Sequence, residues 1–195
     1  MESRVNIFYL HENPQVSAKM HCDKHVVKMI VEYAQLMSTA HRILDGEFYY
    51  GKTARGHKIQ RWKHPNKNVE NTLYKASHIN HPSAIWVRES IANYNWLYDL
   101  FTNLCDEYTH RYGKIHSTDS LLRELLCRPP TNIPENGLTK MPQAMPDDVK
   151  QEDSISAYRD YYITYKKDFA KWTKRETPGW MMKNQNDTMI GCFGS

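Results

Sequence analysis

The strongest constraint on the fold is a long amphipathic segment near the start of the chain, KMHCDKHVVKMIVEYAQLMSTAHRIL, residues 19–44. At about 100° per residue, one stripe of this segment is apolar and wide enough to bury against a core. The stripe contains Val26, Ile30, Ala34, Met37 and Leu44. The segment therefore predicts a long helix with one buried face.

A second stripe of the same helix is polar, and its members project within about 60° of one another. They are His21, His25, Lys28 and Glu32. Apolar residues flank this line on both sides, namely Val27, Val31, Met29 and Leu36. We expect the polar line to form the floor of a groove, and the alternative is an ordinary solvated helix face.

Two further amphipathic segments predict two more long helices. The first runs from His81-Pro82, where proline suits the first turn, to a glycine cap at Gly113. The second covers 153–175 and places Tyr158, Tyr161, Tyr165, Phe169 and Trp172 on one face. With a short helix at 117–128, these segments predict a mainly α, single-domain helical fold with three long helices.

The segments between these helices are predicted to be irregular. Residues 5–10 favour a short N-terminal strand or extended arm. Residues 46–68 form a basic loop, and residues 129–152 form a proline-rich loop. A chain of 195 residues with 40% hydrophobic content can bury one sizeable core, so we expect a single domain over 1–195.

Composition narrows the environment of the protein. No apolar run is long enough to span a membrane, and the N-terminus lacks the pattern of a signal peptide. The cysteines at 22, 105, 127 and 192 form no CxxC pair, which favours reduced thiols and gives no sign of zinc. We therefore expect a cytoplasmic protein without contact with membranes.

Positive charge is concentrated in one place. The net charge is only +4, yet residues 51–67 contain six Lys or Arg and no acidic residue. Such a segment can bind phosphate groups even though the net charge of the whole chain is small. Lys58 and Arg61 are the candidate phosphate contacts. A flexible basic loop without a ligand is the alternative.

Glu32 is the leading candidate for chemistry. A carboxylate between apolar neighbours is partly desolvated, and Lys28 and His25 can set its charge state. We expect Glu32, His25 and Lys28 to be catalytic and His21 to bind substrate. The His21/His25 spacing also suits a metal ion, but no third ligand is evident, so we expect neither a metal nor a cofactor.

The second predicted helix offers candidate substrate contacts. Trp86, Glu89, Asn93 and Trp96 fall within about 80° of one another and could grip a base, although tryptophans in this position often pack in the core. His78 and His81 precede the helix, where an anion could meet their rings and the free N–H groups. Helix capping without a ligand is the alternative for both.

Three motifs carry a resemblance to a known family. CDKHVVKMIVEY, the 81–113 segment and WTKRETPGW together resemble the three-helix plan of the phage pyrimidine-dimer DNA glycosylases of the endonuclease V type. That family pairs a D-x-H helix start with a catalytic glutamate seven residues after the histidine, a spacing that leads here to Glu32. Its closing arginine and tryptophan are matched by Arg175 and Trp180. The whole chain is most similar to uncharacterised tailed-phage proteins.

The sequence departs from that family at two functional positions. The family's nucleophile is the amine of a small residue exposed after methionine removal, whereas here Met1 is followed by the bulky Glu2. We therefore expect base release by water rather than through a Schiff base. The family's arginine before the glutamate is replaced by Val31, so phosphate binding passes to Lys28, His25 or the basic loop.

Three functions follow from these residues. The first is a hydrolase that cleaves the N-glycosidic bond of a base in DNA, and the second is a phage counter-defence protein that cleaves or sequesters a cyclic (di)nucleotide immune signal. The third is a non-enzymatic nucleic-acid-binding accessory protein. The partner is nucleic acid or a small nucleotide in each case, and the sequence leaves the oligomeric state open, a homodimer included.

Overall fold

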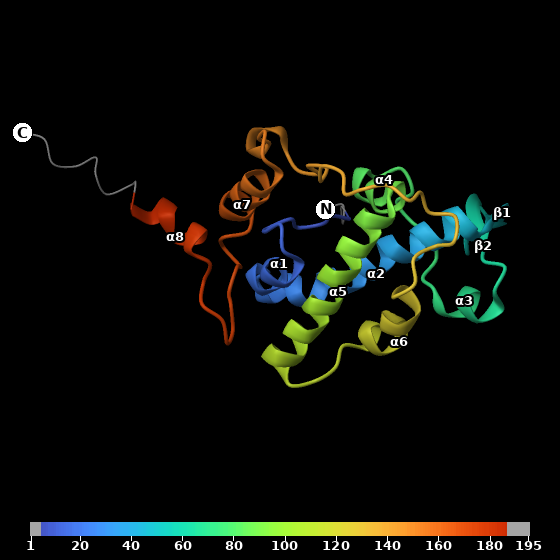
Figure 1. Cartoon of the computed structure of the whole chain (residues 1–195), viewed down its shortest axis with the longest axis horizontal. Helices are drawn as coiled ribbons and strands as arrows, with labels where there is room; N and C mark the ends of the chain where they lie inside the picture. The colour runs from blue at the N-terminus through green and yellow to red at the C-terminus, as the bar shows by residue number, and fades with distance from the viewer. Residues whose placement is uncertain (1–4, 187–195) are drawn as a thin grey trace, which may run out of the picture.

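The computed structural model describes residues 5–186, and most of this part of the chain is helical, which confirms a mainly α fold (Figure 1). Met1, Glu2 and Cys192 lie outside the described residues. No helix within 5–186 is long and apolar enough to cross a membrane. The helices are α1 (Pro14–Met20), α2 (Asp23–Asp45), α3 (Lys67–Thr72), α4 (Pro82–Glu89), α5 (Ile91–Tyr112), α6 (Ser117–Leu126), α7 (Ser154–Tyr165) and α8 (Gly179–Asn186), with a 3₁₀ turn at Asp147–Val149.

The core forms where α2 and α5 cross in the centre of the molecule (Figure 1). The predicted apolar stripe of α2 is buried there, with Val26, Ile30, Ala34 and Met37 fully shielded from solvent. The N-terminal segment 5–10 is an extended arm rather than a strand, and both Ile7 and Leu10 are fully buried.

The first predicted helix begins later than the sequence indicated. Residues 21 and 22 interrupt it, and α2 starts at Asp23. His21 ends α1 in an extended conformation, and its ring bonds the carbonyl of Ser17 at 2.7 Å. The backbone N–H of Asp23 donates to the carbonyl of Lys171 at 2.8 Å. These tertiary bonds hold the chain outside the helical region, so His21 does not belong to the polar stripe of α2.

The second predicted helix is divided at Ser90. This residue is extended (φ −154°, ψ 139°), and its hydroxyl donates to the carbonyl of Gly137 at 2.7 Å. The N–H of Ile91 donates to the carbonyl of Pro134 at 2.9 Å. The proline-rich segment thus docks at the junction of α4 and α5, where a continuous helix would leave no backbone group for it to bind.

The last predicted helix also ends early, at Tyr165. The chain beyond it returns to the start of α2, where the indole N–H of Trp172 bonds the carbonyl of Met20 at 3.0 Å. The N–H and hydroxyl of Thr173 both donate to Asp23. Tyr165 is 45% exposed at the end of α7, Phe169 is partly buried against the core, and Tyr162 on the neighbouring line of α7 is fully buried.

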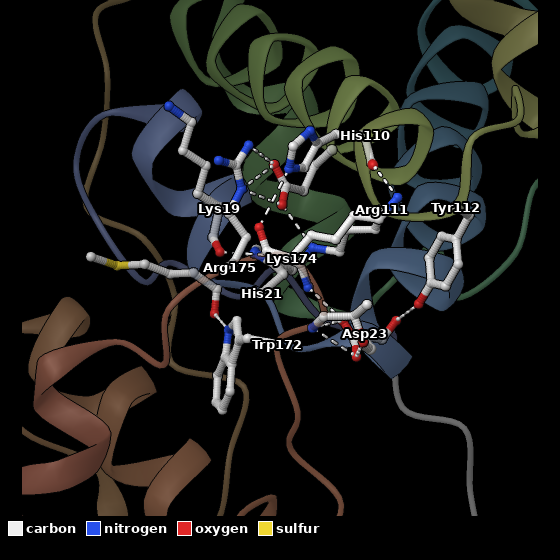
Figure 2. Close-up of polar contacts among 12 residues, drawn as sticks. Lys19, His21, Asp23, His110, Arg111, Tyr112, Trp172, Lys174 and Arg175 are labelled. Carbon is white, nitrogen blue, oxygen red and sulfur yellow. Dashed lines mark hydrogen bonds and ion pairs between the residues drawn. The ribbon is translucent and has the colours of Figure 1, made fainter.

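Two arginines hold this returning segment in place, Arg111 with a fully buried side chain and Arg175 with a side chain that is 32% exposed. Figure 2 shows the side chains of Arg111 of α5 and Arg175 directed at the same acidic side chain, and Asp23 lies close to Arg111. The acidic group is Glu107, which lies 2.7 Å from Arg111 and 2.9 Å from Arg175. Arg111 also reaches Asp23 at 2.8 Å. The cluster joins α1, α2, α5 and the 173–175 segment.

Most of the basic segment is a β-hairpin and not the predicted loop. Strands β1 (Glu47–Lys52) and β2 (Lys58–Lys63) pair antiparallel and project at the end of α2 (Figure 1). Two glycines permit the geometry. A Cβ at Gly46 would lie 2.3 Å from the carbonyl oxygen of Arg42, and Gly56 in the turn has φ +80°.

Arg42 attaches the hairpin to α2. Its side chain is 1% exposed, and its guanidinium donates to the carbonyls of Trp62, Leu73 and Tyr74 and to the carboxylate of Glu70. The guanidinium of Arg42 therefore ties α2 to β2, to α3 and to the segment that follows α3.

Arg42→Ala should lower the free energy of unfolding by about 3 kcal/mol or more, because it leaves Glu70 and several buried carbonyls without donors. Urea unfolding followed by circular dichroism measures this. Arg55→Ala, in the exposed hairpin turn, is the matched control and should cost less than about 0.5 kcal/mol. Equal losses for the two variants would contradict the anchoring role.

Candidate functional site

Glu32 lies on α2 where the N-terminal arm crosses that helix. It is only 8% exposed, and Oε2 accepts a long 3.4 Å hydrogen bond from the backbone N–H of Asn6. The Asn6 side chain is fixed in turn, because it donates to the carbonyl of Ala144 and accepts from the hydroxyl of Tyr158. No sequence pattern pointed to Asn6, since its contact with Glu32 joins residues 26 positions apart.

The second carboxylate oxygen of Glu32 is incompletely compensated. Lys28 Nζ lies 2.9 Å from Oε1, but Oε1 has no hydrogen-bond partner among the described residues. The geometry is thus that of an ion pair without a directed hydrogen bond. Buried polar atoms are rarely left in this state, and the described residues hold three others, Ser38 Oγ, Ser83 Oγ and Trp180 Nε1. Glu32 Oε1 is the one that belongs to a carboxylate.

Lys28 joins this site, whereas His25 lies beside it. The side chain of Lys28 is 56% exposed, so it can reach both Glu32 and a ligand in solvent. His25 is two helical turns from Glu32, about 10 Å along the axis. Its ring stacks on Phe8 at 4.2 Å, and its Nδ1 pairs with the hydroxyl of Tyr162. Burial lowers the pKa of His25 well below 6.5, so the ring is neutral at pH 7.

His21 is enclosed by the protein. It has no exposed surface, and its two ring nitrogens pair with the Ser17 carbonyl and the Tyr33 hydroxyl, each at 2.7 Å. Burial lowers its pKa from 6.5 to about 4. Both nitrogens are therefore committed to the fold, which leaves no group for the substrate contact expected from the sequence.

The residues expected to grip a base are divided between α4 and α5 and are bonded elsewhere. The indole N–H of Trp86 donates to the carbonyl of Thr139, and that of Trp96 donates to the carbonyl of Glu12. The side-chain NH₂ of Asn93 donates to the carbonyl of Trp86 and the hydroxyl of Thr139, and its side-chain oxygen accepts the backbone N–H of Thr139. The two tryptophans are buried and pack edge to face, so they serve the core. Glu89 is exposed at the end of α4.

The histidines before α4 play a local part. His81 caps α4 by accepting the N–H of Ser83 at 3.2 Å. His78 is exposed and has a positive φ of 49°. The remaining cationic candidates, Lys58 and Arg61, lie on β2 of the hairpin, on opposite faces.

A cluster that the sequence prediction missed lies at the other end of α2. Donor atoms of His41, Asp45 and His64 lie within 4.8 Å of one another, beside a cavity of about 320 Å³. The His41/Asp45 spacing of four residues was the available signal. Burial lowers the pKa of His41 to about 4, although Asp45 opposes the shift.

This cluster has structural partners. The carboxylate of Asp45 accepts the backbone N–H groups of Thr131 and Asn132. His64 Nδ1 accepts the N–H of Asn66, which places the proton of the neutral ring on Nε2, 3.9 Å from Asp45. The bonds from Thr131 and Asn132 tie the end of α2 to the proline-rich segment.

Comparison with known proteins supplies the family. The sequence model described as pyrimidine dimer DNA glycosylase matches residues 5–121, more than half of the chain. The chain belongs to this family. The match covers the arm, α2 with Lys28 and Glu32, the hairpin and α5. Arg175 and Trp180 lie beyond it, and the structure gives Arg175 a partner in Glu107. No curated protein and no solved structure matches the chain.

The buried histidines should make this member of the family sensitive to mild acid. His21, His25 and His41 are neutral in the folded state but bind protons near pH 6.5 when unfolded. Stability is then complete above pH 6.5 and falls as the pH drops toward 4. Each histidine should cost about 1.4 kcal/mol of unfolding free energy per pH unit in that window.

Urea unfolding at pH 7 and pH 5 checks this slope. His21→Gln should reduce the slope by one histidine's share, and His57→Gln, at an exposed ring in the hairpin turn, is the matched control variant. A free energy of unfolding that is equal at the two pH values would show that the rings are not shielded in the folded state.

Proposed function

We propose that this protein hydrolyses the N-glycosidic bond of a damaged base in DNA, with Glu32 as the group that acts on the sugar. The observation that carries the proposal is the nearly buried Glu32 carboxylate, one oxygen of which lacks a hydrogen-bond donor in the described part of the chain. Family membership supports DNA as the substrate. The seven-residue spacing from His25 supports the choice of glutamate.

The carboxylate suits the chemistry of glycosidic cleavage. As the bond between C1′ and the base nitrogen breaks, the bonding electrons leave with the base and positive charge develops on the sugar. A carboxylate held in a low-dielectric site stabilises that charge. Water then bonds to C1′, its proton passes to Glu32 and on to solvent, and the departing base takes a proton from solvent.

Lys28 and the N-terminal arm set the orientation of the two carboxylate oxygens of Glu32. Lys28 forms an ion pair with Glu32, and its exposed ammonium can bind a phosphate of the same strand. Asn6 holds Oε2 and leaves Oε1 toward Lys28. The ring of His25 stacks on Phe8 of the N-terminal arm, so we assign His25 the role of positioning that arm against α2.

Glu32→Gln should lower the rate of base release by about 100-fold or more, because the amide keeps the shape but cannot stabilise the positive sugar. The assay uses a duplex oligonucleotide with a single pyrimidine dimer and follows the abasic site by strand cleavage in alkali, because the detached pyrimidine stays covalently joined to its dimer partner. Glu135→Gln, at an exposed carboxylate, is the control and should retain wild-type turnover. Unchanged turnover of a folded Glu32→Gln protein would contradict the proposal.

The same assay separates the other functions. Cyclic dinucleotides incubated in parallel would give a linear product, or would be bound without being cut, if the counter-defence function were correct. DNA left intact in the same experiment would overturn the glycosylase proposal. Binding of DNA without any product would favour the accessory-protein function. If water releases the base, the product strand should stay intact until alkali cleaves it at the abasic site.

A further inference from the structure

The β1–β2 hairpin carries aromatic rings that are about half exposed to solvent. The strand register places Phe48 opposite Trp62 and Tyr50 opposite Gln60 on one face of the ribbon. Phe48 is 48% exposed and Tyr50 is 56% exposed. A two-stranded hairpin has no second layer to bury such rings, and grouped exposed aromatic side chains mark binding surfaces.

These rings form an ordered array with a cation. Tyr50 meets Phe48 edge to face with 5.0 Å between ring centroids, and Phe48 meets Trp62 in the same way at 5.3 Å. The ammonium of Lys58 lies 3.6 Å from the centroid of Tyr50. The rings therefore hold one another in place, and less conformational entropy is lost when a flat ligand stacks on them.

The charge of the hairpin specifies an anionic partner. Between Gly46 and His64 the chain carries five cationic side chains and a single acid, Glu47. The cations are Lys52, Arg55, Lys58, Arg61 and Lys63. Aromatic faces interleaved with cations fit a nucleic acid strand, in which flat bases alternate with phosphates.

We propose that this hairpin binds unpaired nucleotides of a DNA strand, with Phe48 and Tyr50 stacking on bases and Lys58, on the same face, contacting a flanking phosphate. This inference rests on the proposed action on DNA and adds the element that grips the strand away from the reacting base. Unpaired bases present free flat faces, and every base can stack on an aromatic side chain whatever its identity.

The length of α2 sets the distance between the two sites. Glu32 and Gly46 are fourteen residues apart on a continuous helix, about 20 Å along its axis. The hairpin is held rigidly to that helix, since Arg42 donates to the carbonyl of Trp62 at 3.1 Å. At about 3.4 Å per nucleotide, the hairpin should meet the strand roughly six nucleotides from the base at Glu32.

The experiment measures binding in Glu32→Gln protein, so that no substrate is consumed and the outcome does not depend on turnover. Fluorescence anisotropy with labelled single-stranded and duplex oligonucleotides gives the affinities. Phe48→Ala and Tyr50→Ala should each weaken binding to single strands at least about fivefold. Tyr50→Phe, which keeps the ring, should bind normally, and Tyr165→Ala, at a 45% exposed tyrosine on α7, should also bind normally.

Two further measurements separate stacking from simple charge attraction. Lys58→Gln should reduce the dependence of affinity on salt concentration, with the rings unchanged. Oligonucleotides extended by ten nucleotides on one side of a dimer should bind more tightly than those extended by three, and Phe48→Ala should abolish that difference. Affinities that respond to Lys58→Gln but not to Phe48→Ala or Tyr50→Ala would overturn stacking, and affinities unaffected by all three would overturn the hairpin site.

Discussion

The architecture depends on a buried cation, the guanidinium of Arg111. Its side chain is fully buried and bonds Glu107, Asp23 and the carbonyl of Lys19. A guanidinium without these partners would be very costly to bury, so the end of α1, the start of α2 and the second half of α5 must meet around it. Arg175 adds bonds to Glu107 and brings in the chain after α7. The crossing of α2 and α5, and with it the position of Glu32, follows from this meeting.

Two buried glutamates show how the surroundings separate a structural carboxylate from a reactive one. Burial alone would raise the pKa of Glu107, but hydrogen bonds from Arg175 and Arg111 outweigh that effect and hold its pKa below 4.5. All of its acceptor capacity is directed at those arginines. Glu32 is buried to a similar degree but has one long hydrogen bond and one ion pair with a largely exposed lysine. The first carboxylate is fixed by the fold, and the second is left able to interact with a substrate.

Helix α2 links the proposed chemistry to the proposed strand contact. Its first half carries Lys28 and Glu32, and its last turns carry Arg42 and Asp45, which hold the hairpin and the proline-rich segment. Figure 1 places the hairpin at one end of the long axis of the molecule and α7 toward the other. Because the helix between is continuous and packed on α5, the two sites keep a fixed separation, which suits an extended ligand such as a strand.

The sequence alone determined the features that depend on neighbours along one helix. The apolar stripe of α2 predicted the core, the four-residue spacing of Lys28 and Glu32 predicted their contact, and the D-x-H motif predicted the family. Tertiary structure decided the rest through bonds between distant residues. Lys171 and Trp172 end the helix before His21, the Pro134–Gly137 segment breaks the helix at Ser90, and Arg42 anchors residues 47–63 as a hairpin. The periodicity of a sequence shows which face of a segment is apolar. It does not show which distant carbonyl will accept a given N–H group. Those long-range hydrogen bonds bury His21, Trp86 and Trp96 in the core.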